Sequence, residues 1–289
     1  MSKPTIISYG ELLWDVLPSG KLPGGAPMNV AYNLQQLGVQ AGMISSLGKD
    51  AFGDSLRTFV MRKGLSAELV QQNDHYPTGT VYVKLDEKGS PSYEITMPVA
   101  WDFIQPSVKA TEAVKMADAF VYGSLACRSE TSRASLLDLI QQAQRRVFDV
   151  NLREPFYSKE LLETLLQGAH IVKMNDEELE ILSTWFVQAK EPLQQMAQVR
   201  DRFQLEVLIV TKGAKGSDLL DASGLHSVPI VPVQVQDTIG SGDAFLAGFL
   251  SKYFTGHEVA GALAFASKMG AFIASKKGAM PDYSRDEVD

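Results

Sequence analysis

Residues 119–150 read AFVYGSLACRSETSRASLLDLIQQAQRRVFDV, and this stretch contains two short apolar runs with an amphipathic segment between them. The runs at Ala119–Tyr122 and Arg146–Val150 are rich in β-branched and aromatic residues, which favours strands. Between them, Ser132–Ala143 places leucine and isoleucine at helical spacing. A strand, a helix and a second strand in this order predict a parallel pair joined by a crossover helix.

The same alternation continues on both sides of this stretch. Further short apolar runs predict strands at Thr5–Tyr9, Gly42–Leu47, His170–Lys173 and Val207–Thr211, and Asn29–Leu37 has helical spacing. Repeated alternation of this kind is typical of an α/β fold, in which helices cover a mostly parallel central sheet.

One region departs from the alternation. Thr80–Met97 contains two stretches with a period of two residues on either side of Asp86–Gly89, which predicts a β-hairpin. A segment soon after the first strand also reads as extended. We therefore expect a small β-sheet lid formed by residues of about 11–23 and 78–101, both inserted in a single domain that spans residues 1–289.

Composition excludes several classes of protein. The chain has 289 residues and a net charge of −7, without a block of like charges, so it has no electrostatic footprint for nucleic acid or for an anionic membrane. Cys127 is the only cysteine, which rules out an intrachain disulfide, and we expect it to be a packed thiol. The sequence contains no signal-peptide pattern and no apolar run of membrane-spanning length. It therefore predicts a soluble, cytoplasmic protein that acts on small molecules.

Residues 235–243, VQDTIGSGD, are followed by an apolar helical pattern. Free amides of Gly240, Ser241 and Gly242 at the positive end of a helix dipole would bind an anion. Asp243 would then stand beside that anion, where a carboxylate suits a base for an incoming hydroxyl better than a phosphate ligand. The alternative is that the glycines shape a turn while Asp243 merely complements the dipole.

A second glycine motif comes near the first strand. Gly24 and Gly25 precede a helix start, where backbone can approach a ligand closely, and Asn29 offers a donor and an acceptor to a polyhydroxy compound. Glu11 and Asp15 follow the first strand, at the edge where open α/β sheets place ligand residues. Ordinary helix punctuation and exposed carboxylates at a strand end are the alternative explanations.

Three further segments follow predicted strands. Asn175–Glu178 opens a helix and is either an N-cap with acidic residues or a site for magnesium-bound waters. Val210–Gly216 is a glycine turn that could clasp a nucleotide or be a simple hairpin. Asp149–Arg153 ends another strand with polar side chains.

No P-loop or protein-kinase motif is present, and the lack of GxGxxG after the first strand argues against a dinucleotide oxidoreductase.

Together these loops resemble the ribokinase-like, phosphofructokinase-B family of carbohydrate kinases. Gly24-Gly25 with Asn29 resembles its first motif, and Asp237–Asp243 resembles its second, in the right order along essentially the whole chain. The resemblance implies a three-layer sandwich with a mostly parallel sheet, a β-sheet lid over a sugar, and phosphate transfer from ATP to a primary hydroxyl.

The resemblance also implies roles for the two glycine motifs. Asp243 would be the catalytic base, and Gly240, Ser241 and Gly242 would form the anion hole for the transferring phosphoryl group. The residues implied to bind the sugar lie in the first motif and in three other segments, and they are Asp15, Gly24, Gly25, Asn29, Trp101 and Arg153.

ATP and Mg2+ are the cofactors that the resemblance implies. Asn175 and Glu178 match the family's NxxE element, which organises magnesium and phosphate, with Glu178 acting through water. Family members often need a monovalent cation, such as K+, near the loop that begins at Asp237. The sequence leaves that requirement open for this chain.

The nucleotide turn of the family corresponds to Thr211, Gly213 and Gly216. Lys212 stands where many members have an apolar residue, and Ser267 stands where relatives often carry an asparagine near the adenine. These two departures leave the roles of Lys212 and Ser267 open.

Fructose is the substrate we expect, because Asp149–Arg153 and Val99–Asp102 resemble segments of fructokinases. Kinases of 2-keto-3-deoxygluconate share the Asp-x-Asn-x-Arg arrangement, and an arginine suits a carboxylate as well as a phosphate, so they are the alternative, with ribokinase-type kinases after them. A sugar-sensing binding protein of the same fold is the non-enzymatic alternative. Asp243 argues against it, because it stands in an intact anion loop, the anion-binding loop formed by Gly240, Ser241 and Gly242.

Because a two-stranded lid hairpin is marginal alone in water, we also expect a homodimer in which lids pack together.

Overall fold

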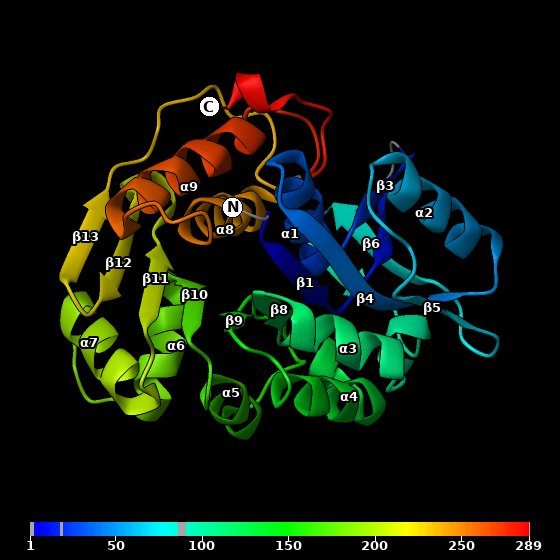
Figure 1. Ribbon diagram of the computed structural model, residues 1–289, viewed down its shortest axis with the longest axis horizontal. Helices are drawn as coiled ribbons and strands as arrows, with labels where there is room; N and C mark the ends of the chain where they lie inside the picture. Colours follow the sequence, from blue (N-terminus) through cyan, green and yellow to red (C-terminus); the bar gives the residue numbers. More distant parts are fainter. Residues whose placement is uncertain (1–2, 18–19, 86–90, 289) are drawn as a thin grey trace.

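The computed structural model describes residues 3–17, 20–85 and 91–288, which fold into two sheets and the helices around them (Figure 1). The larger sheet has the strand order β13-β12-β11-β10-β9-β8-β1-β4-β5. In chain order its strands are β1 (Thr5–Tyr9), β4 (Gln40–Gly48), β5 (Val70–Asn73), β8 (Ala119–Gly123), β9 (Arg146–Asp149), β10 (Ile171–Asn175), β11 (Val207–Thr211), β12 (Ser217–Asp221) and β13 (Gly224–Val228).

The prediction of a mostly parallel central sheet is confirmed. Strands from β11 across to β5 pair in parallel, and only β12 and β13 are antiparallel, at one edge. The predicted strands coincide with β1 and β11 and differ by one or two residues at the ends of the others. From β1 the chain first builds outward through β4 and β5, and it then returns to build the other way from β8. Open α/β sheets bind ligands at such a reversal, beyond the carboxyl ends of the strands.

Helices cover both faces of this sheet, as Figure 1 shows. One apolar cluster joins the sheet to helices on the first face, and two others join it to helices on the second. The first face carries α3 (Val108–Met116), α4 (Glu130–Ile140), α5 (Lys159–Leu166), α6 (Asp176–Phe186) and α7 (Pro192–Phe203), and the second carries α1 (Ala26–Gln36), α2 (Ala51–Arg62), α8 (Ser241–Tyr253) and α9 (Val259–Ala274). Within the described ranges, no helix combines the length and apolar character needed to cross a membrane.

The smaller sheet has the order β3-β2-β6-β7, with β2 (Leu13–Leu17), β3 (Gly20–Gly24), β6 (Gly79–Leu85) and β7 (Pro91–Ile95). β6 and β7 form the predicted antiparallel hairpin, with Val81 opposite Ile95. The expected turn at Asp86–Gly89 lies outside the described residues, as does Pro18. The strands stop at Ile95, and the last residues of the expected lid run into a short 3-10 helix at Ala100–Phe103 that belongs to the core of the larger sheet.

Helix α1 begins earlier than its apolar spacing predicts. The spacing starts at Asn29, whereas the helix starts at Ala26, because Pro27 supplies the fixed φ that suits a first turn. Asn29 therefore lies near the start of α1, and this position directs its side chain to the carboxyl edge of the sheet. This edge holds the candidate site.

Candidate active site

Two helices begin side by side at the carboxyl edge of the larger sheet. α1 starts after Gly25 and α8 starts after Gly240, and the two helices pack against each other. The Asn29 side-chain amide donates a hydrogen bond of 2.7 Å to Asp243 Oδ2. Both side chains are buried, with relative exposures of 4% and 9%. The fold thus joins the two glycine motifs through their polar residues.

The environment of Asp243 suits a proton acceptor. Burial, followed by the nearby Asp149 carboxylate, raises the pKa of Asp243 to about 6, while Lys173, Asn29 and Arg153 act in the opposite direction. The carboxyl group is therefore ionised at neutral pH but holds a proton more readily than an exposed aspartate. General bases of enzymes work best with a pKa near the operating pH.

The loop before α8 is held in one conformation. Asp237 accepts hydrogen bonds from the amides of Ile239 and Gly278 with its two carboxylate oxygens. Gly240 has a φ of +77°, and a Cβ there would lie 2.3 Å from the Cβ of Ala279, so only glycine fits.

The expectation of three free amides in this loop is wrong in one respect. The Ser241 amide donates to the Thr238 carbonyl at 3.2 Å, and the Ser241 hydroxyl donates to the Gly270 carbonyl at 3.0 Å, so Ser241 is used within the protein. Gly242 lies in the first turn of α8, where an amide has no acceptor within the helix. The anion site therefore rests on the backbone of Gly240 and Gly242 and on the helix dipole.

Lys173 is a site residue that the sequence analysis missed. Its ammonium lies 3.0 Å from Asp149 Oδ1, and a Cβ on Gly242 would be 3.1 Å from Nζ. Burial lowers the pKa of this amine, but Asp149, Asp243 and Glu178 more than offset that effect, so the net shift is upward and the amine stays charged. A lysine within the otherwise apolar run of β10 was the available signal, because an unpaired lysine is rarely buried in a central strand.

On the side of the smaller sheet, Gly24 and Asp15 lie on paired strands. A Cβ on Gly24 would be 2.3 Å from Asp15 Oδ2, so glycine leaves room for the carboxylate. Burial raises the pKa of Asp15 to about 6, with Arg153 opposing. Gly25 has a φ of +113° and packs against the Glu11 carbonyl oxygen, which a Cβ would approach to 2.3 Å. Each residue of the pair is thus glycine for a steric reason, because a Cβ at either position would clash.

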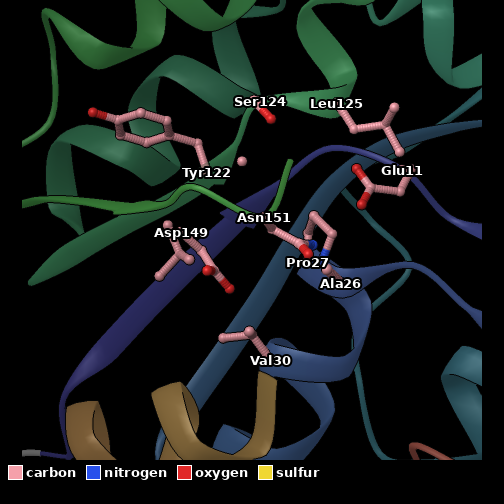
Figure 2. A pocket seen from close by; sticks show the side chains of 11 residues that line it. Glu11, Ala26, Pro27, Val30, Tyr122, Ser124, Leu125, Asp149 and Asn151 are labelled. Carbon is pink, nitrogen blue, oxygen red and sulfur yellow. The ribbon is translucent and has the colours of Figure 1, made fainter. Parts of the chain in front are cut away.

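Glu11, which the sequence places with Asp15 at the ligand-binding edge of the sheet, is another buried carboxyl of the site. It lines a small cavity with Asp149, Asn151 and Ser124, and Figure 2 shows these side chains around it. Burial raises the pKa of Glu11 to about 7, with Arg153 lowering it and Asp243 raising it. The site therefore contains several carboxyl groups whose charges interact.

Two buried acceptors in this site have no hydrogen-bond partner among the described residues: Asn29 Oδ1 and Asp149 Oδ2. Both side chains are 4% exposed. A buried acceptor without a donor is costly, and such atoms in native proteins usually mark a place for a ligand or water. Hydroxyl groups, which donate hydrogen bonds, would satisfy both atoms.

Asn175 and Glu178 form a capping box at the start of α6. Asn175 Oδ1 accepts from the Glu178 amide, and Glu178 accepts from the amides of Asn175 and Leu152. Burial is the main reason that the pKa of Glu178 is raised, and Lys173 opposes it. The N-cap explanation is thus confirmed. It leaves room for a second role, because a carboxylate oxygen can accept more than one hydrogen bond.

The expected nucleotide turn lies between β11 and β12. Gly216 has a φ of +87°, and a Cβ there would come within 2.1 Å of the Val228 carbonyl oxygen. Lys212, whose role the sequence left open, pairs with Asp218 at 2.6 Å. Gly213 has open space around it, and Thr211 contacts the Met174 carbonyl oxygen at 3.4 Å.

Ser267 lies on α9 and is 5% exposed. Its hydroxyl donates to the Pro229 carbonyl oxygen at 3.1 Å. The side chain therefore ties α9 to the segment after β13. This contact gives the serine a structural role, and its place near an adenine stays a prediction.

Trp101 has to be reassigned. It has no exposed surface, because the Arg128 guanidinium lies 3.9 Å from the centre of its ring and the core of the larger sheet encloses the rest. A sugar has no access to this ring in the structure, so Trp101 is a core residue beside the smaller sheet. Arg153, by contrast, is exposed at the site, where its charge acts on Glu11 and Asp15.

The comparison with protein families accounts for this arrangement. The family model described as pfkB family carbohydrate kinase matches residues 7–285. The chain belongs to the pfkB family of carbohydrate kinases. It is a sugar kinase, that is, a phosphotransferase with an alcohol group as acceptor, and the expected fold, family and enzyme class are confirmed.

Three relatives show how close the resemblance of this pfkB kinase is. A fructokinase from Salmonella typhimurium is 30% identical, with 96% of each chain covered. The structure of a Xylella fastidiosa fructokinase with bound ATP has a TM-score of 0.85 and 25% identity, over 96% of this chain and 94% of that one. A double mutant of a Vibrio cholerae O395 fructokinase, in a form with fructose, ADP and potassium ion, has a TM-score of 0.85 and 27% identity, over 99% and 97%.

Glu178, which lies at the start of α6 with Asn175, is the residue that would meet a magnesium ion through water. Across residues 3–17, 20–85 and 91–288, no group of three or more His, Cys, Asp or Glu side chains is gathered to hold a metal directly. Mg2+ commonly binds through few protein ligands, several waters and substrate phosphates. Glu178, with both oxygens already bonded to amides, suits contact through such a water.

Proposed function

We propose that this kinase transfers the γ-phosphoryl group of ATP to a primary hydroxyl of fructose. The observation that carries the proposal is the pair of partnerless acceptors, Asn29 Oδ1 and Asp149 Oδ2, beside the carboxyl of Asp243. Several acceptors around one base suit a compound with several hydroxyl groups. The similarity to fructokinases supports fructose among such compounds.

In the proposed reaction, Asp243 accepts the proton of the sugar hydroxyl. The hydroxyl oxygen forms a bond to the γ-phosphorus, the bond from that phosphorus to the bridging oxygen of ADP breaks, and ADP leaves with the electron pair. The amides of Gly240 and Gly242 and the α8 dipole stabilise the charge on the transferring group. Magnesium bound near Asn175 and Glu178 would neutralise charge on the phosphate oxygens, and K+ near Asp237 is the proposed monovalent cation.

On the sugar side, we propose that Asp15, the backbone of Gly24 and Gly25, Asn29 and Arg153 contact hydroxyl groups. On the nucleotide side, the turn containing Thr211, Gly213 and Gly216 would contact ATP. Because Asp15 would meet hydroxyls and not phosphates, Asp15→Ala should raise the KM for the sugar more than that for ATP. Asp54→Ala, which removes an exposed acidic residue from the first turn of α2, serves as the control. Equal effects of Asp15→Ala on both KM values would contradict this division.

A coupled assay of ADP release tests the substrate. The panel is fructose, ribose, 2-keto-3-deoxygluconate, fructose phosphates and nucleosides, each with ATP and Mg2+. We expect the highest kcat/KM for fructose. A higher value for 2-keto-3-deoxygluconate would mean that Arg153 reads a carboxylate, and fructose would then be the wrong assignment. If none of these compounds supports ATP turnover, the result would favour a sugar-sensing protein.

We further propose that two copies of the chain pack through the smaller sheet. Tyr82 on β6 and Met97 after β7 are large apolar side chains with relative exposures of 41% and 58%. Burying the apolar part of these side chains that is still exposed is favourable, at roughly 25 cal/mol per Å². Light scattering should therefore give a dimer at micromolar concentration, and Tyr82→Glu with Met97→Glu should give a monomer. A wild-type monomer at high micromolar concentration would contradict the proposal.

A further inference from the structure

Lys173 is buried among acidic residues at the centre of the site. Its ammonium contacts Asp149 at 3.0 Å, and the two side chains are 9% and 6% exposed. The ammonium also lies against Gly242, one residue before Asp243. The Lys173 ammonium therefore lies next to the backbone of the anion loop, at Gly242.

The register of the sheet explains this position. Asp149 on β9 and Lys173 on β10 are paired, and paired residues of neighbouring strands point to the same face. Two positions earlier, Val147 and Ile171 pack in the apolar cluster that contains α8. Asp149 and Lys173 must therefore also face α8, under its first turn.

The charged and polar groups that act on Asp243 come from several elements around it. They are Asp149 on β9, Lys173 on β10, Asn29 on α1, Arg153 after β9, Glu11 after β1 and, through Lys173, Glu178 on α6. Of the two cations, Lys173 is buried whereas Arg153 is exposed and more strongly screened by solvent. The Asp149 carboxylate raises the pKa of Asp243, and the Lys173 ammonium opposes that effect.

We propose that Lys173 is a positioning residue, whose ammonium is held by Asp149 and keeps the neighbouring Asp243 carboxyl ionised and ready to accept the hydroxyl proton. The inference rests on the proposed role of Asp243 as the base. A simple structural ion pair is the competing explanation, and it makes a different prediction: loss of Lys173 would then change stability, and would lower activity by the same factor at every pH.

The test is the pH dependence of kcat/KM, measured with ATP and whichever sugar of the panel has the highest kcat/KM. Lys173→Met should move the acid limb of the profile up by at least about one pH unit, which is about a tenfold loss of kcat/KM at pH 6 relative to the plateau. Asp149→Asn should move the limb down, because it removes a like charge. The double variant should lie between them. Shifts of opposite sign are not expected from a loss of packing.

A matched control and a second background keep the test decisive. Lys63→Met removes another largely buried lysine of an ion pair, at the C-cap of α2, and should leave the limb in place. If Lys173→Met does not fold because it leaves Asp149 unpaired, the comparison of Asp149→Asn with the double variant measures the same shift without that carboxylate. An acid limb that stays in place when Lys173 is removed overturns the inference. Asp243→Asn in the same assay separates the two proposals, since near-normal turnover in that variant would reject the base itself.

Discussion

The side-chain amide of Asn29 donates a hydrogen bond to Asp243 Oδ2 over 2.7 Å, although 214 positions separate the two residues in the chain. The bond joins the first turns of α1 and α8 and leaves Asn29 Oδ1 without a partner among the described residues. Asn29 can therefore orient the proposed base with one atom and accept from a sugar hydroxyl with the other.

Removing this amide should affect chemistry as well as sugar binding. Asn29→Ala removes a hydrogen bond that favours the ionised carboxyl, so the pKa of Asp243 should rise and the acid limb of kcat/KM should move to higher pH. A hydrogen bond to a charged group contributes about 1.5–3 kcal/mol, so we expect kcat to fall by at least about tenfold. Asn33→Ala, one turn along α1, is the control, because Asn33 bonds to Asn29 O and Tyr283 but not to Asp243. An unchanged kcat in Asn29→Ala with only a raised sugar KM would leave Asn29 as a sugar ligand alone.

The proposed base itself should control turnover. General bases contribute about 10² to 10⁴ in rate, so Asp243→Asn should lower kcat by at least about a hundredfold while the melting temperature changes little. The reacting form is the ionised carboxyl, and its pKa of about 6 means that wild-type kcat/KM should fall about tenfold per pH unit below pH 6. A folded Asp243→Asn protein with near-normal kcat would exclude the mechanism.

The anion loop should tolerate no side chain at Gly240. Gly240→Ala puts a Cβ into a left-handed conformation and against Ala279, and we expect a loss of stability of about 1–3 kcal/mol together with a fall in kcat. Gly261→Ala is the matched control, because this helical glycine has open space around it and the change should stabilise α9 by about 0.5–1 kcal/mol. Urea unfolding measures both. A Gly240→Ala protein as stable and active as the wild type would show that the loop readily rearranges.

The ion pair between Arg128 and Asp102 should be important for stability. The side chains are 1% and 3% exposed, and Arg128 also donates to the Thr96 carbonyl at the end of the smaller sheet. Removing one partner of a buried pair typically costs 3–5 kcal/mol, so Arg128→Met should lower the free energy of unfolding by about that much. Adding Asp102→Asn should recover part of the loss, since no buried charge then remains unpaired. If the double variant is as unstable as Arg128→Met, the guanidinium stabilises mainly by packing on Trp101.

The sequence predicts a local feature well where a single physical reason favours one residue type at that position. The sequence predicts a turn or an anion-binding loop at Gly240 and a close approach of the backbone to a ligand at Gly25, and both glycines have positive φ in the structure. Asn175 and Glu178 form the capping box that helix physics predicts from the sequence. The capping box lies within four residues of the chain, so it needs no knowledge of the fold. The contacts that exclude a side chain at Gly240 and Gly25, with Ala279 and the Glu11 carbonyl, come from the fold.

The sequence alone determined the strand and helix alternation, the glycine motifs and a carboxylate at a helix start, because periodicity and turn chemistry are local properties. Only the tertiary structure decided which side chains meet. The register of β9 and β10 pairs Lys173 with Asp149, the packing of α1 on α8 brings Asn29 to Asp243, and the core encloses Trp101. Burial and the distance between charges set the pKa of Asp243 and of Lys173, and both depend on segments far apart in the chain.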